Sequence, residues 1–480
     1  MQKIFLSLFI LFASLINANA KDGYSIKATF TDQKDTMVYL CNYFGKASNV
    51  YRVDSAKLNS NGEVTFKSAK KIVGGIYSIL FYDRTTNVEF ILNNGDDISF
   101  QTTRSNIYQT IVFKGGSENL EFYDYQRFLV KYGSEYQKIE GQLVLAKNKK
   151  DTSVVYEKLK VKGKELQAYR ENIIAKKPTT FLAKLFNAVS EPDIPTVLPT
   201  NPDGSKDSLY PRNFYKAHFW DKYDFRDDRL IYSPLYESKL ENYMSKLVIP
   251  TPDSVEKECD MILQKAKGME ETFKYSLWYL TRWTETSKIM GMDEAFVYLV
   301  ENYYMKGLAP WTDSAQLAKY EDRARKIAPN MIGQPAMDLR MMDTSGLNVV
   351  PLSAVKANYT ILIFWSPTCG HCQKEMPKFD SLYKVALKNY NVKIYAVEAD
   401  GETDKWKKFI VDNKLGEGWV HAHDPNHTSN FRAFYDVYST PTLYLLDENK
   451  VIRGKRIDHT NVLGLIEWLE KKKKTNKEKK

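Results

Sequence analysis

Cysteine is scarce in this sequence: only four of the 480 residues are cysteines, and two of them, Cys369 and Cys372, lie three positions apart. A Cys-x-x-Cys pair is also half of a zinc site, and zinc needs two more ligands, usually a second such pair or paired histidines. The chain lacks a second Cys-x-x-Cys pair. This absence argues against zinc binding by the pair.

Histidine is also sparse, with six residues in all, of which His421, His423 and His427 form one local cluster. Two of these fall on one face of a predicted strand, so they are the remaining candidates for zinc ligands. We interpret them as polar residues at a strand end and a helix start, and we expect no metal site.

Basic residues are not gathered into a stripe. The net charge is +10, but the last ten residues, KKKKTNKEKK, contribute +6 of it and Lys3 contributes one more. Because no basic stripe is interleaved with aromatic residues along a phosphate-binding path, we expect no nucleic-acid partner. We predict that residues 473–480 form a basic, disordered tail.

The N-terminal apolar run, residues 4–16, is too short to span a membrane comfortably. A lysine precedes it and the small-residue sequence ANA ends at residue 20, which is the layout of a secretory signal peptide. The first cysteine is Cys41, so no lipid-modified cysteine lies at the cleavage point. We predict a soluble exported protein with residues 1–20 removed and no stable membrane insertion; an uncleaved anchor is the alternative.

The rest of the chain is too long for one core, and its pattern changes twice. Residues 21–117 alternate with period two between Asn-Gly-type turns, which predicts an antiparallel β domain. Residues 118–327 carry apolar side chains at helical spacing around a proline-rich loop at 191–205, which predicts a mainly α-helical domain. Residues 328–472 alternate strand and helix, which predicts an α/β domain with a largely parallel sheet. The fold class is therefore multidomain α+β.

The Cys-x-x-Cys pair lies between the strand-like run ILIFW and a helical segment, so Cys369 is expected at the first turn of that helix. Unpaired N–H groups and the helix dipole stabilise an anion there, which favours the thiolate. Cys372, one turn later, is close enough to close a disulfide. Cys369 would form a mixed disulfide with a partner and Cys372 would resolve it, with no cofactor.

Further motifs surround the pair. Phe364 and Trp365 precede it, Pro377 lies five residues after Cys372, and the tripeptide TPT occupies residues 440–442. With these motifs in these positions, the C-terminal region resembles the thioredoxin-fold module of the TlpA-like periplasmic thiol-disulfide oxidoreductases. The resemblance implies a thioredoxin fold, a periplasmic location, protein dithiol or disulfide substrates and a partner that recharges the pair.

The same resemblance implies roles for individual residues. Pro441 is expected to be cis and to pack opposite the cysteines, with the Thr440 backbone pairing with an extended substrate. Glu375 takes the place of the buried acid that exchanges a proton with the second cysteine. Trp365 and His371 are placed with the substrate-binding residues.

Two features depart from the family pattern. The residue before Cys369 is Thr368 rather than the frequent tryptophan, which changes the expected docking surface. The residues between the cysteines are Gly370 and His371, a dipeptide similar to that of disulfide isomerases. A histidine there favours the thiolate, so we predict a less reducing potential than thioredoxin's.

Two other functions remain alternatives. One is a thiol peroxidase, although Pro367, Thr368 and Cys369 are contiguous here, whereas such peroxidases place a proline and a threonine several positions ahead of the cysteine. The other is a non-catalytic cell-envelope binding protein whose first two domains hold a ligand. The two upstream domains resemble uncharacterised domains that precede such modules in exported Gram-negative proteins. Cys41 and Cys259 are interpreted as buried thiols, with a disulfide between them as the alternative.

Overall fold

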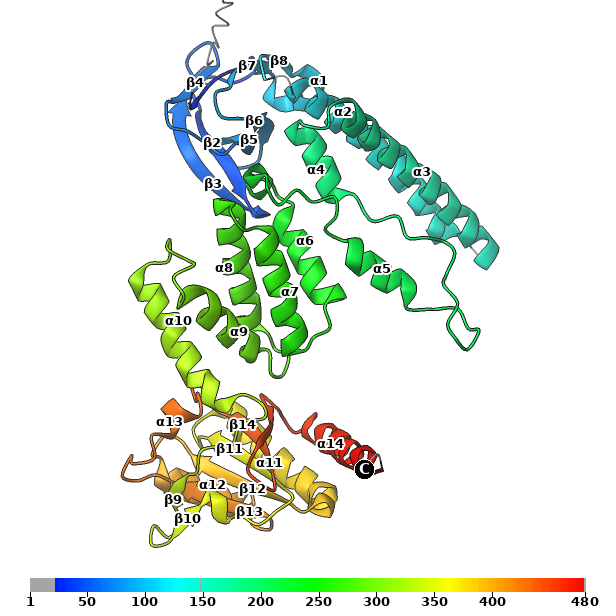
Figure 1. Cartoon of the computed structure of the whole chain (residues 1–480). Coiled ribbons are helices and arrows are strands. Elements are labelled where there is room, and N and C mark those ends of the chain that lie inside the picture. Colours follow the sequence, from blue (N-terminus) through cyan, green and yellow to red (C-terminus); the bar gives the residue numbers. More distant parts are fainter. Residues whose placement is uncertain (1–21, 117, 147, 479–480) are drawn as a thin grey trace, which may run out of the picture. The chain divides into compact units, whose positions relative to one another are not determined.

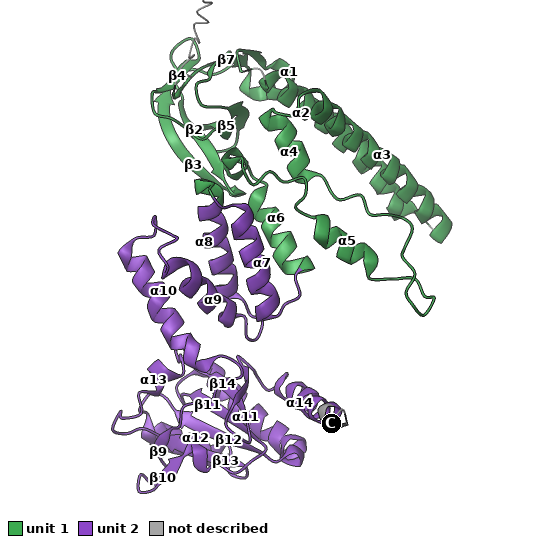
Figure 2. Cartoon of the chain, in the orientation of Figure 1, with its two compact units in different colours: residues 1–247, 268–272 green, residues 248–267, 273–480 purple. Residues whose placement is uncertain are grey.

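The structure is a computed structural model that describes residues 22–116, 118–146 and 148–478. The predicted signal peptide lies outside the described residues. The chain divides into two compact units (Figure 2): the first comprises the chain up to Leu247 with Gly268–Thr272, and the second comprises Val248–Lys267 and Phe273–Lys480. Within the described ranges, no helix is both long and apolar enough to cross a membrane.

The first unit contains two four-stranded sheets, with strand orders β4-β1-β7-β8 and β3-β2-β5-β6. Every pair of neighbouring strands is antiparallel except β1 and β7, which are parallel. The period-two apolar residues of the sequence are buried between the sheets, which confirms the predicted β domain. The strands are β1 (Tyr24–Phe30), β2 (Met37–Phe44), β3 (Lys46–Lys57), β4 (Glu63–Ser68), β5 (Gly75–Phe81), β6 (Asn87–Leu92), β7 (Asp97–Thr102) and β8 (Val112–Lys114).

Helices belong to the same compact unit as these sheets. The side chain of Asn119 joins the helical segment to the edge of β6: it accepts from the Ile91 N–H at 2.8 Å and donates to the Ile91 carbonyl at 2.9 Å. The helices are α1 (Ile107–Thr110), α2 (Asn119–Glu140), α3 (Lys149–Lys176), α4 (Phe181–Val189), α5 (Tyr210–His218) and α6 (Tyr236–Asn242).

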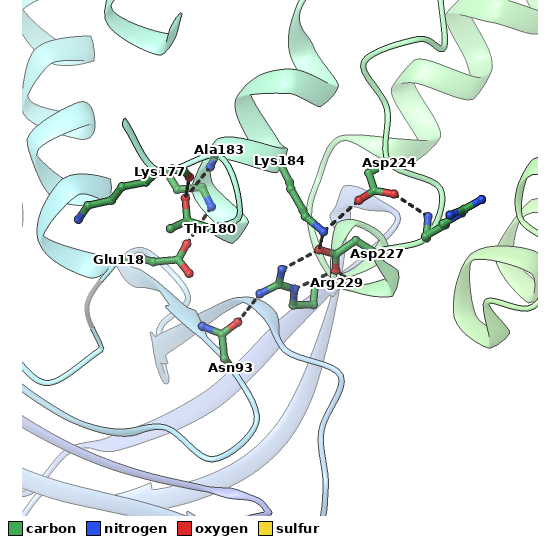
Figure 3. A network of polar contacts seen from close by, with 11 residues as sticks. Asn93, Glu118, Lys177, Thr180, Ala183, Lys184, Asp224, Asp227 and Arg229 are labelled. Carbon is green, nitrogen blue, oxygen red and sulfur yellow. Dashed lines mark hydrogen bonds and ion pairs between the residues drawn. The ribbon is translucent and has the colours of Figure 1, made fainter. Parts of the chain in front are cut away.

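A buried polar network also ties helix α4 to the sheets (Figure 3). Asp227 accepts from the Arg229 guanidinium at 2.6 and 2.8 Å, and its carboxylate lies 2.8 Å from the Lys184 ammonium. Arg229 donates in turn to Asn93, in the turn between β6 and β7, at 2.7 Å. Burial raises the pKa of Asp227, but the hydrogen bonds from Arg229 and Lys184 outweigh it and bring the pKa to about 2. The network therefore stays ionised at neutral pH.

The second unit begins with helices and continues into a sheet (Figure 1). The sheet has seven strands in the order β10-β9-β13-β12-β11-β14-β15. The first helix of this unit begins at Pro252, in the first turn, where a proline is tolerated. The elements are α7 (Pro252–Lys265), α8 (Glu270–Thr286, whose first residues belong to the first unit), α9 (Asp293–Leu299), α10 (Ser314–Ile327), β9 (Arg340–Met342), β10 (Val349–Pro351), β11 (Tyr359–Trp365), α11 (Gly370–Val385), β12 (Val392–Glu398), α12 (Thr403–Asp412), β13 (Trp419–His423), α13 (Phe431–Phe434), β14 (Thr442–Asp447), β15 (Ile452–Lys455) and α14 (Val462–Glu478).

The centre of this sheet is parallel, since β11 pairs with β12 and β12 with β13 in parallel register. β14 and β15 pair in antiparallel register and form a hairpin at one edge of the sheet. Every residue of β11 is buried, as a central strand covered on both faces requires. One face packs against α11, α12 and α14, and the other packs against α13 and the segment that leads into the sheet.

The C-terminal residues differ from the expected disordered tail. Helix α14 continues to Glu478, so the prediction is wrong for residues 473–478, and residues 479–480 are not described. Lysines at the end of a helix are favoured by its dipole. Lys473 also forms ion pairs with Glu448 at 3.0 Å and Glu470 at 3.6 Å, and Lys472 lies 5.0 Å from the ring centre of Trp468.

Candidate active site

Cys369 lies at the N-terminus of α11, directly after the turn that follows strand β11. It is the capping residue of the helix, and its Sγ accepts a hydrogen bond from the Cys372 N–H at 3.4 Å. The expectation that this cysteine occupies the first turn of a helix is therefore confirmed. The side chain is partly exposed, whereas that of Cys372 is fully buried.

The Thr440–Pro441 peptide bond is cis, as expected, and its loop lies against the cysteines. In the thiol form, Cys369 donates a hydrogen bond to the Thr440 carbonyl, with an S···O distance of 3.3 Å. The contact joins residues that are 71 positions apart in the sequence. It brings together the two motifs that the sequence singled out separately.

The environment of Cys369 favours its thiolate. Burial raises the pKa of the thiol, but hydrogen bonds from the Cys372 side chain and N–H, from Thr440 and from the His371 N–H outweigh it. The net pKa lies below the ordinary value for cysteine. A sulfur at this position is therefore a better nucleophile near neutral pH than an unperturbed thiol would be.

The environment of Cys372, in contrast, favours its protonated thiol. Burial raises the pKa of its thiol to about 12, and the neighbouring Cys369 adds to the effect. The pKa values of the two thiols are therefore shifted in opposite directions, with the more acidic thiol toward solvent and the less acidic one in the core. This difference separates an attacking cysteine from a resolving one.

Glu375 lies one turn beyond Cys372 on α11 and is buried. Its carboxylate accepts from Lys378 at 3.1 Å and lies 2.6 Å from Nδ1 of His459, in the loop that precedes α14. Burial raises the pKa of Glu375, but the hydrogen bonds from His459 and Lys378 lower it further, so that the net pKa is below its usual value. Glu375 is thus an ionised acid with a partly exposed histidine between it and solvent.

His459 carries no sequence signal that marks it as a residue of the site. It lies 84 residues from Glu375 and is flanked by Asp458 and Thr460, with no motif around it. His459 reaches Glu375 because α14 packs on the same face of the sheet as α11.

Trp365 does not lie at the surface where the resemblance places it. Its side chain is fully buried and its ring packs 5.2 Å from that of Phe409. Alternation along β11 explains the difference, since Trp365 shares a face with Ile361 and Ile363 and belongs to the same core cluster as Cys372. His371, by contrast, is exposed beside Cys369.

Two of the three clustered histidines, His421 and His423, pack against the core of the sheet, whereas His427 is exposed. The rings of His421 and His423 lie 6.4 and 4.9 Å from that of Trp406, and His421 Nε2 is 2.7 Å from the Leu415 carbonyl. No group of three or more potential metal-ligating side chains occurs in the part of the chain that the structure describes.

The other two cysteines are buried free thiols, Cys41 in the first unit and Cys259 in the second. Burial raises the pKa of both. Neither has the exposure of Cys369, and they are expected to stay outside the redox chemistry.

Three family models match successive parts of the chain. Residues 332–455 match the AhpC/TSA family, residues 157–330 match a domain of unknown function (DUF5106), and residues 24–122 match another (DUF4369). The AhpC/TSA match contains both Cys369 and the cis-proline loop. The two upstream matches carry no described activity.

Curated relatives align with the same C-terminal region. Sporulation thiol-disulfide oxidoreductase A of Bacillus subtilis is 30% identical over 118 residues, covering 24% of this chain and 68% of the relative. Thiol-disulfide oxidoreductase ResA of Bacillus thuringiensis is 33% identical over 118 residues, covering 25% of this chain and 65% of the relative. The chain thus spans about two thirds of the length of these relatives.

Among solved structures, a thioredoxin-like protein from Bacteroides caccae is similar to a larger part of the chain. It is 20% identical, with a TM-score of 0.45, and the match covers 57% of this chain and 99% of that one.

Proposed function

Because the chain belongs to the thioredoxin-like thiol-disulfide oxidoreductases, we propose that it exchanges disulfides with protein substrates through Cys369 and Cys372. The observation that supports the proposal is that the pKa values of the two thiols are shifted in opposite directions. Cys369, at a helix N-terminus, is favoured as a thiolate, and Cys372 is kept as a buried thiol. Thr440 and Pro441 form the proposed docking surface for the substrate backbone, with the exposed His371 beside it.

Exchange begins when the Cys369 thiolate attacks one sulfur of a substrate disulfide. A Cys369–substrate S–S bond forms, the substrate S–S bond breaks, and the leaving sulfur departs as a thiolate. Cys372 then loses its proton and attacks Cys369 Sγ, which closes the Cys369–Cys372 disulfide and releases the second substrate sulfur. Two electrons pass from the pair to the substrate, and the same steps in reverse oxidise a substrate dithiol.

The second step requires that a proton leave the buried Cys372. In this proposal Glu375 receives that proton, because it is ionised, buried and one helical turn away. His459 bonds to the same carboxylate and is partly exposed, so it passes the proton on to solvent.

The proposed location is the periplasm, which rests on the signal-like residues 1–20 and on the family. The mature protein would then begin at Lys21. An intact protein that begins at Met1 in the cell envelope, shown by N-terminal sequencing, would contradict removal of the signal.

A single-turnover experiment tests the proposed function. The reduced full chain, mixed with an equimolar disulfide-bonded protein, is expected to reduce one substrate disulfide for each Cys369–Cys372 disulfide that peptide mapping detects. A chain with both Cys41→Ser and Cys259→Ser should retain that stoichiometry, since neither thiol takes part. Oxidation of the pair by hydrogen peroxide at catalytic rates, with no reaction toward the protein disulfide, would favour a thiol peroxidase and contradict the proposal.

A further inference from the structure

A cavity of about 360 Å³ adjoins the cis-proline loop within the second unit. Ser439, Pro441 and Thr442 of that loop form part of its wall. The charged side chains described below come from helix α10, from the segment after α13, and from the end of strand β15 with the residue that follows it. The cavity therefore borders the loop whose Thr440 carbonyl contacts the attacking sulfur.

The lining carries more positive than negative charge. Its charged members are Arg323, Asp436, Lys455 and Arg456. The Lys455 ammonium is 2.5 Å from the carboxylate of buried Asp293, so its charge is already neutralised. Arg323 is likewise paired with Asp436, at 2.8 Å.

Arg456 is left without an acidic partner. It is exposed, and its guanidinium donates to the backbone carbonyl of Ser287 at 2.8 Å. Among the described residues, no carboxylate lies within ion-pair distance of it. One full positive charge therefore remains at the cavity, with donors still available on the guanidinium.

Arg323 comes from helix α10, upstream of the thioredoxin-like region. Its guanidinium lies 4.4 Å from the ring centre of Tyr438, an exposed residue next to the cis-proline loop. Stacking on this ring and pairing with Asp436 hold the guanidinium in place while it keeps further N–H groups for a ligand. Helix α10 thus contributes directly to the cavity beside the cis-proline loop.

We propose that this cavity binds an acidic side chain, aspartate or glutamate, of the substrate polypeptide. The inference rests on the proposed function, since it concerns the substrate docked at the same loop. A substrate that places its sulfur on Cys369 and runs along the Thr440 backbone brings residues about two to four positions from its own cysteine to the cavity. A carboxylate there forms a charge-assisted hydrogen bond with Arg456.

Two peptide disulfides, identical except for Glu or Gln three positions from the reacting cysteine, test the inference on the full chain. We expect kcat/KM to be about fivefold higher for the Glu peptide than for the Gln peptide, which is the effect expected of one partly exposed ion pair. In Arg456→Gln the ratio should fall to about 1. The matched control is Arg340→Gln, which removes the same charge from the exposed strand β9, away from the cavity, and should keep the ratio.

Salt provides a second measurement that needs no variant. For the wild type, the ratio of kcat/KM for the Glu peptide to that for the Gln peptide should also fall toward 1 at about 1 M salt, because exposed charges are screened there. Equal kcat/KM for the two peptides at low salt, with exchange still taking place, would overturn the acidic subsite and leave the proposed function standing. Absence of exchange with both peptides would overturn the proposed function itself.

Discussion

A chain that carries Cys372→Ala is expected to accumulate as a covalent adduct with its substrate and to lose steady-state turnover by about 10³-fold or more. The attack by Cys369 does not need Cys372 as a nucleophile, because Cys369 keeps its position at the N-terminus of α11 and the backbone N–H of residue 372 still donates to its sulfur. The second step has no nucleophile in this variant. The mixed disulfide therefore persists, whereas in the wild type Cys372 removes it.

Non-reducing electrophoresis followed by peptide mass spectrometry would detect the adduct and identify the sulfur that holds it. Cys259→Ala is the matched control, since it removes another buried helical thiol of the same unit and should neither trap substrate nor slow turnover. An adduct that forms equally well when Cys369 is also replaced would show that another residue captures the substrate.

Glu375→Gln is expected to slow the resolving step by about 10²-fold, the lower end of general-base effects, and to leave the first attack nearly unchanged. The amide keeps the size of the side chain but cannot accept the proton of Cys372. His459→Asn should slow the same step, because it interrupts the path from Glu375 to solvent. Both variants should therefore accumulate the mixed disulfide transiently.

Rapid acid quenching at successive times separates the two steps. Glu375 contacts His459 and Lys378, and its pKa is lowered. The faster resolving step of the wild type should therefore be present at neutral pH and be lost as the pH falls through the pKa of Glu375. Glu402→Gln is the matched control, since Glu402 also pairs with a lysine three positions later but lies directly before α12 rather than on α11. Equal slowing of both steps in Glu375→Gln would indicate a structural role instead.

Local sequence was sufficient to place the attacking cysteine of the candidate site. The position of Cys369 at a helix N-terminus follows from an apolar strand followed directly by a helical segment, and both are short-range patterns. The cis bond before Pro441 and its closeness to Cys369 came from the resemblance, because no local pattern joins residues so far apart in the sequence. Both expectations agree with the structure.

What the sequence could not provide depends on packing between distant elements. His459 pairs with Glu375 only because the loop before α14 meets α11. Trp365 was assigned to the substrate surface, but strand alternation directs it into the core beneath Cys372. Arg323 reaches the cis-proline side of the molecule through the packing of α10, which helical periodicity does not reveal.

The central claim is that the pKa values of the two thiols of one motif are shifted in opposite directions. The most direct test is to alkylate the reduced chain with iodoacetamide over a range of pH and to measure each cysteine separately by mass spectrometry. Because a thiolate forms above its pKa, we expect Cys369 to react with a midpoint below the usual value of about 8.5. Cys372, whose pKa is raised to about 12, should stay unmodified at neutral pH. Equal rates for the two cysteines at neutral pH, or a midpoint for Cys369 at or above the usual value, would contradict the account.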